Sequence, residues 1–308
     1  MDAIRLHQFA EKLEVAGYSR RCIEDYPKVV AHFLAYLDEH EAVRSLDHVT
    51  AEHVKAYQTH VQFGLLKEGK PLSTGGVCTR LTALKTFFRL MHREGLLPED
   101  LSRFVVLPRY RKHLPRNVPS QEQMRALLAA ADRSTPLGVR DRAILELLYA
   151  TGLRSEELRG LQVEDWDSEA NTLLVHGKGS KERVVPLGAW VVPYLHRYIE
   201  RARSLLAPSP RGLLFVSKRG RKIARANLTQ MVRRYVRKAG LAGVTVHTLR
   251  HACATHLLEN GADIRYIQEL LGHADLSATQ IYTRVDISSL KQAHQRFHPR
   301  EREAAGNA

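Results

Sequence analysis

A basic, proline-containing stretch without acidic residues divides this sequence into two parts. Residues 102–117 carry five Lys or Arg residues and two prolines, Pro108 and Pro115. Proline fixes φ and has no backbone N–H, which disfavours a continuous helix through this stretch. We therefore predict two domains that are joined here. The stretch is either a solvated linker or a strap that follows a polyanion, and both interpretations fit its composition.

Residues 1–101 have the apolar spacing of helices. Apolar side chains recur at steps of three and four, and Ser19 can cap the helix that carries the first of two stripes. The stripes consist of Ile23, Tyr26, Val30, Phe33 and Leu37, and of Val77, Leu81, Leu84, Phe88 and Met91. We assign both stripes to the core of a helical domain.

Residues 118–300 change from helical to strand patterning and back. Helices are predicted from Ser120 and over residues 140–150. Short β-type runs at 172–175 and 183–187 flank a glycine-rich turn, which predicts an antiparallel hairpin. Residues 213–216 suggest a further strand, with helices after it. We expect a mainly α-helical domain with a small antiparallel sheet, followed by a flexible tail at 301–308.

The charge balance favours a polyanionic partner. The chain has 47 Lys and Arg against 33 Asp and Glu, a net charge of +14, and residues 218–238 hold nine basic residues and no acidic one. Counterion release makes nucleic acid the leading candidate, and a merely basic soluble protein is the alternative.

Membrane and extracellular classes fit the sequence poorly. No apolar run approaches the length of about 20 residues that spans a bilayer, and the N-terminus has no signal-peptide pattern. The three cysteines, Cys22, Cys78 and Cys253, are scattered and lack CxxC spacing. This usage argues against a disulfide framework and fits a reducing cytoplasm.

Two segments hold a basic side chain in a constrained position. Gly152 can end one helix while Glu156 and Glu157 suit the first turn of the next, so Arg154 lies at a helix junction. A structural Arg–Glu pair is the plainer explanation. Lys178 lies in the glycine-rich turn, where the P-loop pattern is not met, and a solvated turn lysine is the plainer explanation there.

A third segment, residues 246–251, combines histidines with an arginine. On a helix His247 and Arg250 share a face, so both can reach one phosphate. His247 and His251 also have the spacing of a zinc pair. HExxH is absent, however, and no nearby carboxylate or cysteine completes a ligand set, so metal binding is the weaker interpretation.

A fourth segment ends in a tyrosine. Gly272 can terminate a helix and place His273 in a turn, and Ser277 with Gln280 forms a capping box shortly before Tyr282. A phenol has an ordinary pKa of about 10 and is a poor nucleophile without activation. By itself Tyr282 is more typical of a half-buried core tyrosine.

Together the four segments resemble the active-site motifs of the tyrosine recombinase (phage integrase) family, most closely its Xer branch. The segments are TGLRSEEL at 151–158, HGKGSKERVVPL at 176–187, HTLRHACATHLLENGADIRYIQELLGH at 247–273 and LSATQIYTRV at 276–285. Residues 19–37 and 72–97 resemble helices of the family's core-binding domain, so the likeness covers nearly the whole chain.

The resemblance implies a phosphate site without a metal or other cofactor. Arg154 and Arg250 would clamp the scissile phosphate through the planar donor fork of the guanidinium group. His247 and His273 would hydrogen-bond its oxygens, and His247 would assist deprotonation of the nucleophile.

The implied reaction is strand exchange. Tyr282 would attack phosphorus and form a 3′-phosphotyrosyl bond, while Lys178 would protonate the leaving 5′ oxygen. A 5′ hydroxyl from a partner strand would then reverse the step, and two such exchanges would recombine two duplexes.

The resemblance also implies an architecture. A helical core-binding domain at 1–101, the basic linker at 102–117 and a catalytic domain at 118–300 would form a clamp around double-stranded DNA. A helix from about Val285 to Gln295 would dock on a neighbouring subunit, in a homotetramer or in a heterotetramer with a sister recombinase. No membrane contact is implied.

Three alternatives remain open at this point. A DNA-binding regulator could keep the fold and lose catalysis. A type IB topoisomerase shares the chemistry and relaxes supercoils without a specific site. Within recombinases, dimer resolution of chromosomes or plasmids and integration or transposition of a mobile element are both compatible with the sequence.

Overall fold

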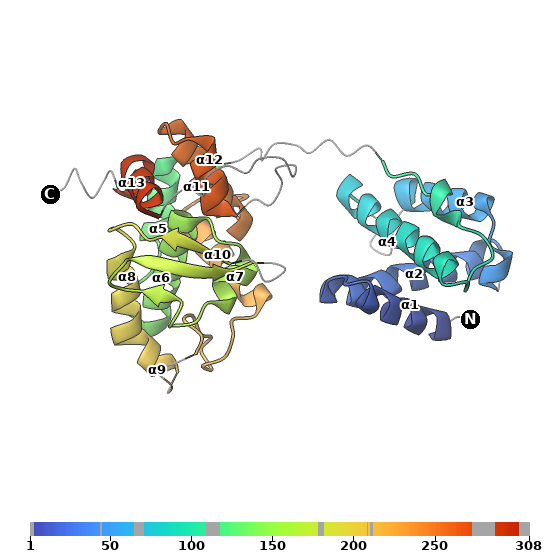
Figure 1. The fold of residues 1–308 in the computed structure, drawn as a ribbon, viewed down its shortest axis with the longest axis horizontal. Coiled ribbons are helices and arrows are strands. Elements are labelled where there is room, and N and C mark those ends of the chain that lie inside the picture. Colours follow the sequence, from blue (N-terminus) through green and yellow to red (C-terminus); the bar gives the residue numbers. More distant parts are fainter. Residues whose placement is uncertain are drawn as a thin grey trace. The chain divides into compact units, whose positions relative to one another are not determined.

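The chain forms two units, Met1–His113 and Leu114–Ala308. The computed structural model describes residues 3–43, 45–64, 71–108, 118–177, 182–207, 209, 212–272 and 287–301. Both units are mainly helical, and the second also carries a small antiparallel sheet, as predicted (Figure 1). None of the helices in these ranges is long and apolar enough to cross a membrane.

The N-terminal unit packs its helices around an aromatic core. Its elements are α1 (Ala3–Val15), α2 (Arg20–His40), η1 (Leu46–His48), α3 (Ala51–Phe63), α4 (Thr74–Arg93) and η2 (Leu101–Phe104). Ser19 caps α2, as predicted, by accepting a hydrogen bond from the N–H of Cys22 at 3.4 Å. Phe33 of α2 packs against Tyr57 of α3 and Phe88 of α4, with ring centroids 4.9 and 5.8 Å apart. Both predicted stripes face this core.

The N-terminal unit extends beyond the predicted start of the linker. Leu101 and Val105 are buried in its core. The amide side chain of Gln58 donates to the carbonyl of Phe104 at 3.0 Å and accepts from the N–H of Val106 at 2.7 Å. The linker prediction from residue 102 was therefore wrong at its first residues, because their partner lies more than forty positions earlier. Residues 109–117 lie outside the described ranges.

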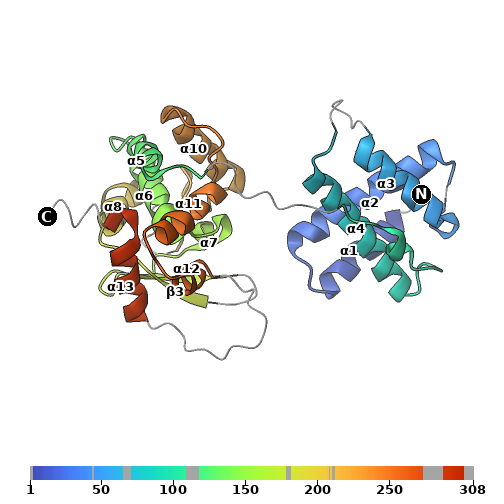
Figure 2. The same ribbon diagram turned by 90° about the horizontal axis from the view of Figure 1, so that it is seen from above.

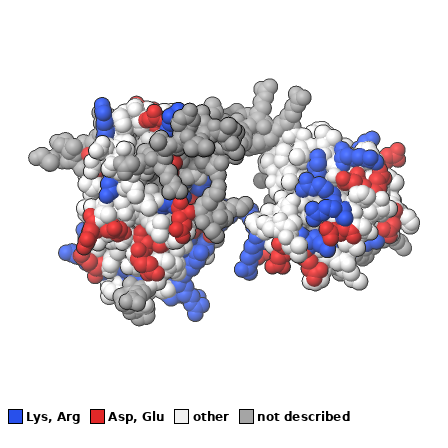
Figure 3. All heavy atoms as spheres, viewed as in Figure 1, with Lys and Arg blue, Asp and Glu red and all other residues white. Residues whose placement is uncertain are grey.

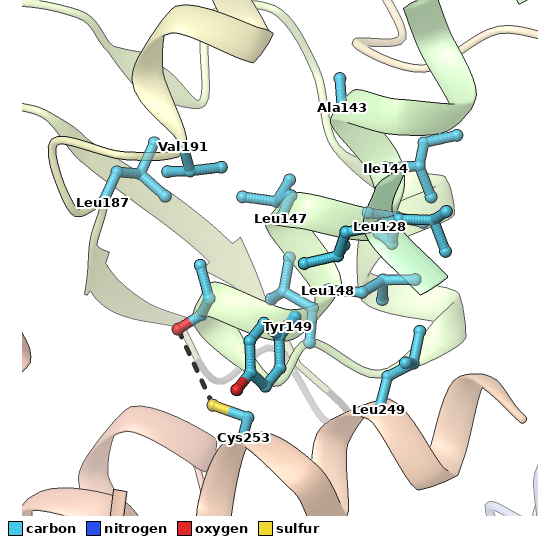
Figure 4. Close-up of a cluster of buried hydrophobic side chains, with 14 of the residues drawn as sticks. Leu128, Ala143, Ile144, Leu147, Leu148, Tyr149, Leu187, Val191, Leu249 and Cys253 are labelled. Carbon is cyan, nitrogen blue, oxygen red and sulfur yellow. Dashed lines mark hydrogen bonds between the residues drawn. The ribbon is translucent and has the colours of Figure 1, made fainter. Parts of the chain in front are cut away.

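The C-terminal unit surrounds one buried helix. Its elements are α5 (Gln121–Ala129), α6 (Pro136–Thr151), α7 (Ser155–Gly160), β1 (Trp166–Asp167), β2 (Thr172–His176), β3 (Glu182–Pro186), α8 (Val192–Tyr198), the π-helix η3 (Ile199–Arg203), α9 (Ser204–Leu206), α10 (Arg225–Lys238), α11 (Val246–Glu259), α12 (Ile264–Leu271) and α13 (Ile287–Phe297). Almost every residue of α6 is buried. Figure 4 shows Leu147 and Leu148 of α6 among Leu128 of α5 and Leu249 of α11. Helix α6 is therefore the centre of the core.

The sheet has the order β1-β2-β3 and is antiparallel throughout. The predicted hairpin is confirmed, with Leu173 of β2 opposite Val185 of β3 and both buried. The predicted strand at 213–216 is wrong, since these residues form only isolated bridges, Gln162↔Leu213 and Val216↔Lys222. Their apolar side chains are buried in the core without a continuous partner strand, and burial alone produced the strand-like pattern.

Hydrogen bonds connect the last described residues, from His294 to Glu301, to α6 and to the segment before α8. His294 and His298 donate from Nε2 to the carbonyls of Ala150 and Tyr149, at 2.9 and 3.2 Å. Burial lowers the pKa of both histidines, which keeps the rings neutral. The carboxylate of Glu301 accepts the N–H groups of residues 189 and 190 at 3.0 and 3.1 Å. The predicted flexible tail is therefore wrong at Glu301, while residues 302–308 lie outside the described ranges.

Helix α13 lies beside β3 of its own chain (Figure 2). The sequence predicted a helix over about Val285 to Gln295, and the structure places it at Ile287–Phe297. Its docking on a neighbouring subunit stays a prediction.

Because each unit has its own core, we expect core substitutions to act on one unit at a time. Phe88→Ala should lower the free energy of unfolding of the N-terminal unit by about 3–5 kcal/mol. Both tryptophans, Trp166 and Trp190, belong to the C-terminal unit. Urea denaturation followed by circular dichroism should therefore detect the loss, while the tryptophan fluorescence transition stays in place.

The matched control is Leu147→Ala in α6, which should shift the fluorescence transition. A fluorescence shift caused by Phe88→Ala would contradict independent unfolding of the two units.

Candidate active site

The carboxylate of Glu157 holds two arginines at the start of α7. Its oxygens accept the backbone N–H and Nη1 of Arg154, both at 2.8 Å. They also accept Nη1 and Nη2 of Arg183 on β3, at 3.0 and 2.9 Å. Burial works to raise the pKa of Glu157, but the hydrogen bonds from Arg183 and Arg154 outweigh it and lower that pKa to about 2. The carboxylate is therefore ionised at neutral pH.

Three arginines meet at the C-terminal end of α12. Arg183 donates from Nε to the carbonyl of Leu270 at 3.2 Å, and Arg250 donates from Nη2 to that of Leu271 at 2.9 Å. Arg154 donates from Nη2 to the carbonyl of Gly272 at 3.1 Å. The last carbonyls of a helix carry its negative dipole end, which attracts cations. We call Arg154, Arg183 and Arg250 the arginine cluster.

Two glycines allow this close packing. Gly152 ends α6 at φ 61° and Gly272 ends α12 at φ 64°, both in the left-handed conformation, and both helix ends were predicted from the sequence. A Cβ on Gly152 would lie 2.4 Å from Cδ2 of Leu271, and one on Gly272 would lie 3.0 Å from Cδ of Arg183. A larger residue at either position would displace the side chain of Leu271 or that of Arg183, a member of the arginine cluster.

The arginine cluster has more positive than negative charge. Arg250 is 5% exposed and also donates from Nη1 to the carbonyl of Gly152 at 2.6 Å. Burial and the neighbouring Arg154 lower its pKa to about 10, so it stays charged at neutral pH. The side chain of Arg154 is 47% exposed and accessible to a ligand. Three guanidinium groups against one carboxylate suit the binding of an anion.

His247 lies in the first turn of α11, near the arginine cluster. Burial is the main cause that lowers the pKa of His247, and the nearby His251, Arg250 and Arg154 lower it further. Its Nε2 lies 3.0 Å from Nε2 of His251. Within the described ranges no group of three His, Cys, Asp or Glu side chains is arranged to hold a metal ion.

The other predicted site residues, Lys178, His273 and Tyr282, lie outside the described ranges. Described residues lie close to each of them in the sequence. Strands β2 and β3 bracket Lys178, Gly272 directly precedes His273, and α13 begins a few residues after Tyr282. The structure thus brings Arg154, His247 and Arg250 to one place, and the roles of all six residues remain predictions.

Sequence reasoning missed two residues of this region. Arg183 was assigned only to a strand, although an arginine directly before two valines of a strand was a usable signal. His176, at the end of β2, places Nε2 3.1 Å from the Asp165 carboxylate and Nδ1 3.0 Å from that of Glu182. These carboxylates raise the pKa of His176. His176 therefore links β2 to Asp165, just before β1, and to Glu182 on β3, beside the turn that carries Lys178.

Glu157→Gln tests the carboxylate at the centre of the arginine cluster. The pKa of Glu157 is lower in the folded chain (about 2) than in the unfolded chain (about 4.5), so its ionised form stabilises the fold above pH 4.5. We expect the variant to lose on the order of 2–3 kcal/mol at pH 7. The difference from wild type should shrink as the pH falls below 4.5, measured by urea denaturation.

Glu156→Gln is the matched control, because the neighbouring Glu156 side chain is 65% exposed. A stability loss as large as that of Glu157→Gln in this control would contradict the assignment.

His176→Gln tests the link beside the turn. A histidine pKa that is raised by folding stabilises the fold below the unfolded pKa of about 6.5, and this contribution disappears as the pH rises through the folded pKa. The variant should therefore be less stable than wild type at pH 5.5 and closer to it at pH 8.5. Glu182→Gln should lose part of the same stabilisation. If the stability of wild type and of His176→Gln changed with pH in the same way, the proposed stabilisation by the contacts of His176 with its two carboxylates would be ruled out.

Two family models match this chain. The model described as "Phage integrase family" matches residues 118–288, and the one described as "Phage integrase, N-terminal SAM-like domain" matches residues 6–96. The first contains the arginine cluster and all six predicted site residues, and the second covers most of the N-terminal unit.

Curated proteins and solved structures agree with these matches. The chain is 40% identical over 292 residues to "Tyrosine recombinase XerC 2" of Ralstonia nicotianae, covering 94% of this chain and 84% of that protein. It is 46% identical over 222 residues to "Tyrosine recombinase XerD" of Pseudomonas aeruginosa, covering 71% and 74%. The XerH site-specific recombinase bound to difH substrate, in its pre-cleavage complex, matches with a TM-score of 0.68 at 25% identity, covering 94% of this chain and 82% of that chain.

The resemblance inferred from the four motifs is confirmed by these comparisons. The chain belongs to the phage integrase family of tyrosine recombinases, which catalyse DNA cleavage and strand transfer.

Proposed function

We propose that the arginine cluster binds the scissile phosphate of double-stranded DNA and that this site-specific recombinase cleaves its target through a covalent phosphotyrosine at Tyr282. One observation carries the proposal. Arg154 and Arg250, from separate motifs, donate to the consecutive carbonyls of Gly272 and Leu271, directly before His273. Two permanent cations are thus held together beside the segment that leads to the nucleophile.

The two arginines suit the charge of the reaction. A phosphodiester under attack gains negative charge on its non-bridging oxygens, and preorganised donors stabilise that charge most in a partly buried site. Arg250 is fixed by the carbonyls of Gly152 and Leu271, whereas Arg154 keeps an exposed side chain. Arg250 provides a rigid donor, and Arg154 reaches the phosphate from the solvent side.

The remaining residues move protons. The Oη of Tyr282 forms a bond to phosphorus while the bond from phosphorus to the 5′ oxygen breaks. His247 accepts the phenol proton, Lys178 gives a proton to the leaving 5′ oxygen, and His273 hydrogen-bonds a phosphate oxygen. The product is a 3′-phosphotyrosyl bond, which a 5′ hydroxyl of a partner strand attacks in the reverse sense.

The charge distribution supports a DNA partner. All nine Lys and Arg residues between 218 and 238 are exposed, on α10 and the segment before it. The buried carboxylate of Asp141 accepts hydrogen bonds from Arg234 and Tyr235 of α10, at 2.6 and 3.0 Å, and fastens that helix to α6. Acidic side chains gather elsewhere, on the face of the C-terminal unit in Figure 3. The XerH relative was solved on its difH substrate.

The proposed domain organisation follows the sequence. The N-terminal core-binding domain, a linker that ends at residue 117 and the catalytic domain at 118–300 enclose the duplex, and residues 102–105, first assigned to the linker, belong to the core-binding domain. Synapsis of two duplexes needs four catalytic chains, supplied by this protein alone or together with a sister recombinase.

Suicide-substrate trapping tests the nucleophile. Wild type and Tyr282→Phe are incubated with nicked duplexes that carry candidate sites, with EDTA and without ATP. We expect a denaturation-resistant protein–DNA adduct with wild type only. The same adduct with Tyr282→Phe would disprove the assignment. Tight binding without an adduct at any site would leave an unidentified site, a missing partner recombinase or a catalytically inactive regulator as the explanation. Sites at replication termini or plasmids would indicate dimer resolution, and mobile-element ends would indicate integration or transposition.

Arg250→Lys tests the clamp. Lysine keeps the charge but cannot replace the fork that donates to two carbonyls, so cleavage should slow by about a hundredfold. Single-turnover cleavage of the same substrate measures the rate, and Arg201→Lys, at an exposed position, is the control. Cleavage by Arg250→Lys at the control rate would contradict the proposed role of Arg250.

A further inference from the structure

The imidazole rings of His247 and His251 form a pair on the first two turns of α11. They are separated by four positions, so both lie on one face of the helix. Their Nε2 atoms are 3.0 Å apart, and their ring centroids are 4.3 Å apart with planes at 75°. This is a hydrogen bond between two ring nitrogens.

Such a contact holds one proton. Two bare nitrogens would repel through their lone pairs, and two N–H groups would repel through their hydrogens, so one ring donates and the other accepts. In a neutral imidazole only one nitrogen carries hydrogen. The ring that donates from Nε2 therefore has a bare Nδ1, and the ring that accepts at Nε2 has a protonated Nδ1.

The surroundings keep His247 neutral. Partial burial is the main effect that opposes a positive charge on its ring, and the neighbouring His251 and Arg250 on α11 and Arg154 at the start of α7 act in the same direction. His247 is thus neutral around pH 7, and the position of the shared proton decides whether its Nδ1 is an acceptor or a donor.

We propose that His251 is a positioning residue for His247, accepting the Nε2 proton of His247 and thereby leaving Nδ1 bare to receive the proton of Tyr282. This inference rests on the proposed function, in which His247 is the base. His251 touches neither DNA nor the nucleophile in this role. It fixes the orientation of the neighbouring ring and its tautomer.

The tautomer can be measured without any substrate. In full-length protein labelled with ¹⁵N-histidine, the nitrogen shifts of His247 should show hydrogen on Nε2 and a bare Nδ1. His251→Leu removes the acceptor for the Nε2 proton, so we expect a mixed tautomer for His247. A wild-type spectrum with hydrogen on Nδ1 of His247 would overturn the inference.

Kinetics supply the second readout. Single-turnover cleavage should slow about tenfold in His251→Leu, as expected for the loss of one hydrogen bond, while His251→Gln should retain most activity because its amide oxygen can accept the same proton. Cleavage requires neutral His247, so its rate falls as the pH drops. His7→Gln, at an exposed site on α1, controls for the histidine change itself.

The double variant His247→Gln, His251→Leu separates a positioning role from a structural one. If His251 acts through His247, the double variant should cleave no more slowly than His247→Gln alone. Additive losses, or a fall in thermal stability that matches the loss of rate, would overturn the inference. Unimpaired cleavage by His247→Gln would disprove the proposed base instead, and the tautomer measurement would still test the histidine pair. If His247→Gln cleaved more slowly than wild type but His251→Leu did not, the proposed function would stand and the role of His251 would be refuted.

Discussion

The carboxylate of Glu157 is the interaction on which the phosphate site depends. Three guanidinium groups in a partly buried place repel one another, and only an opposite charge with well-placed acceptors makes such an arrangement stable. Glu157 provides that charge and accepts four hydrogen bonds from Arg154 and Arg183. The pKa of its carboxyl group, about 2, keeps it ionised at neutral pH. The remaining positive charge is what a phosphate would neutralise.

The ends of helices supply the rest of the site. Helix α6 ends at Gly152, α12 ends at Gly272, and the carbonyls at these ends accept from Arg250 and Arg154. Helices α7 and α11 begin at the same place and carry Glu157 and His247. Arginines at carbonyl ends and a carboxylate at an amide end follow the direction of the helix dipole. Backbone groups that would otherwise lack partners thus fix the side chains that carry the proposed chemistry.

Local signals allowed much of this to be predicted. Ser19 as a cap, Gly152 and Gly272 as helix ends, and the apolar stripes of α2 and α4 each depend on neighbours within a few residues. Contacts between distant segments were not predictable from one sequence. Arg183 is held by Glu157, His176 by Asp165, and Glu301 by backbone N–H groups more than a hundred positions earlier. The chemistry itself came from the motif resemblance, since Tyr282 alone is an ordinary tyrosine.

The capping of α6 also bears on the order in which the chain can fold as it is made. The carbonyls of Ala150 and Tyr149 receive hydrogen bonds from His294 and His298, which follow 144 and 149 positions later. The helix at the centre of the core therefore lacks these partners until nearly 300 residues have left the ribosome. The core of the N-terminal unit is complete at Val105, so this unit does not depend on residues that are made later. During synthesis the chain would hold a folded N-terminal unit well before it holds a working phosphate site.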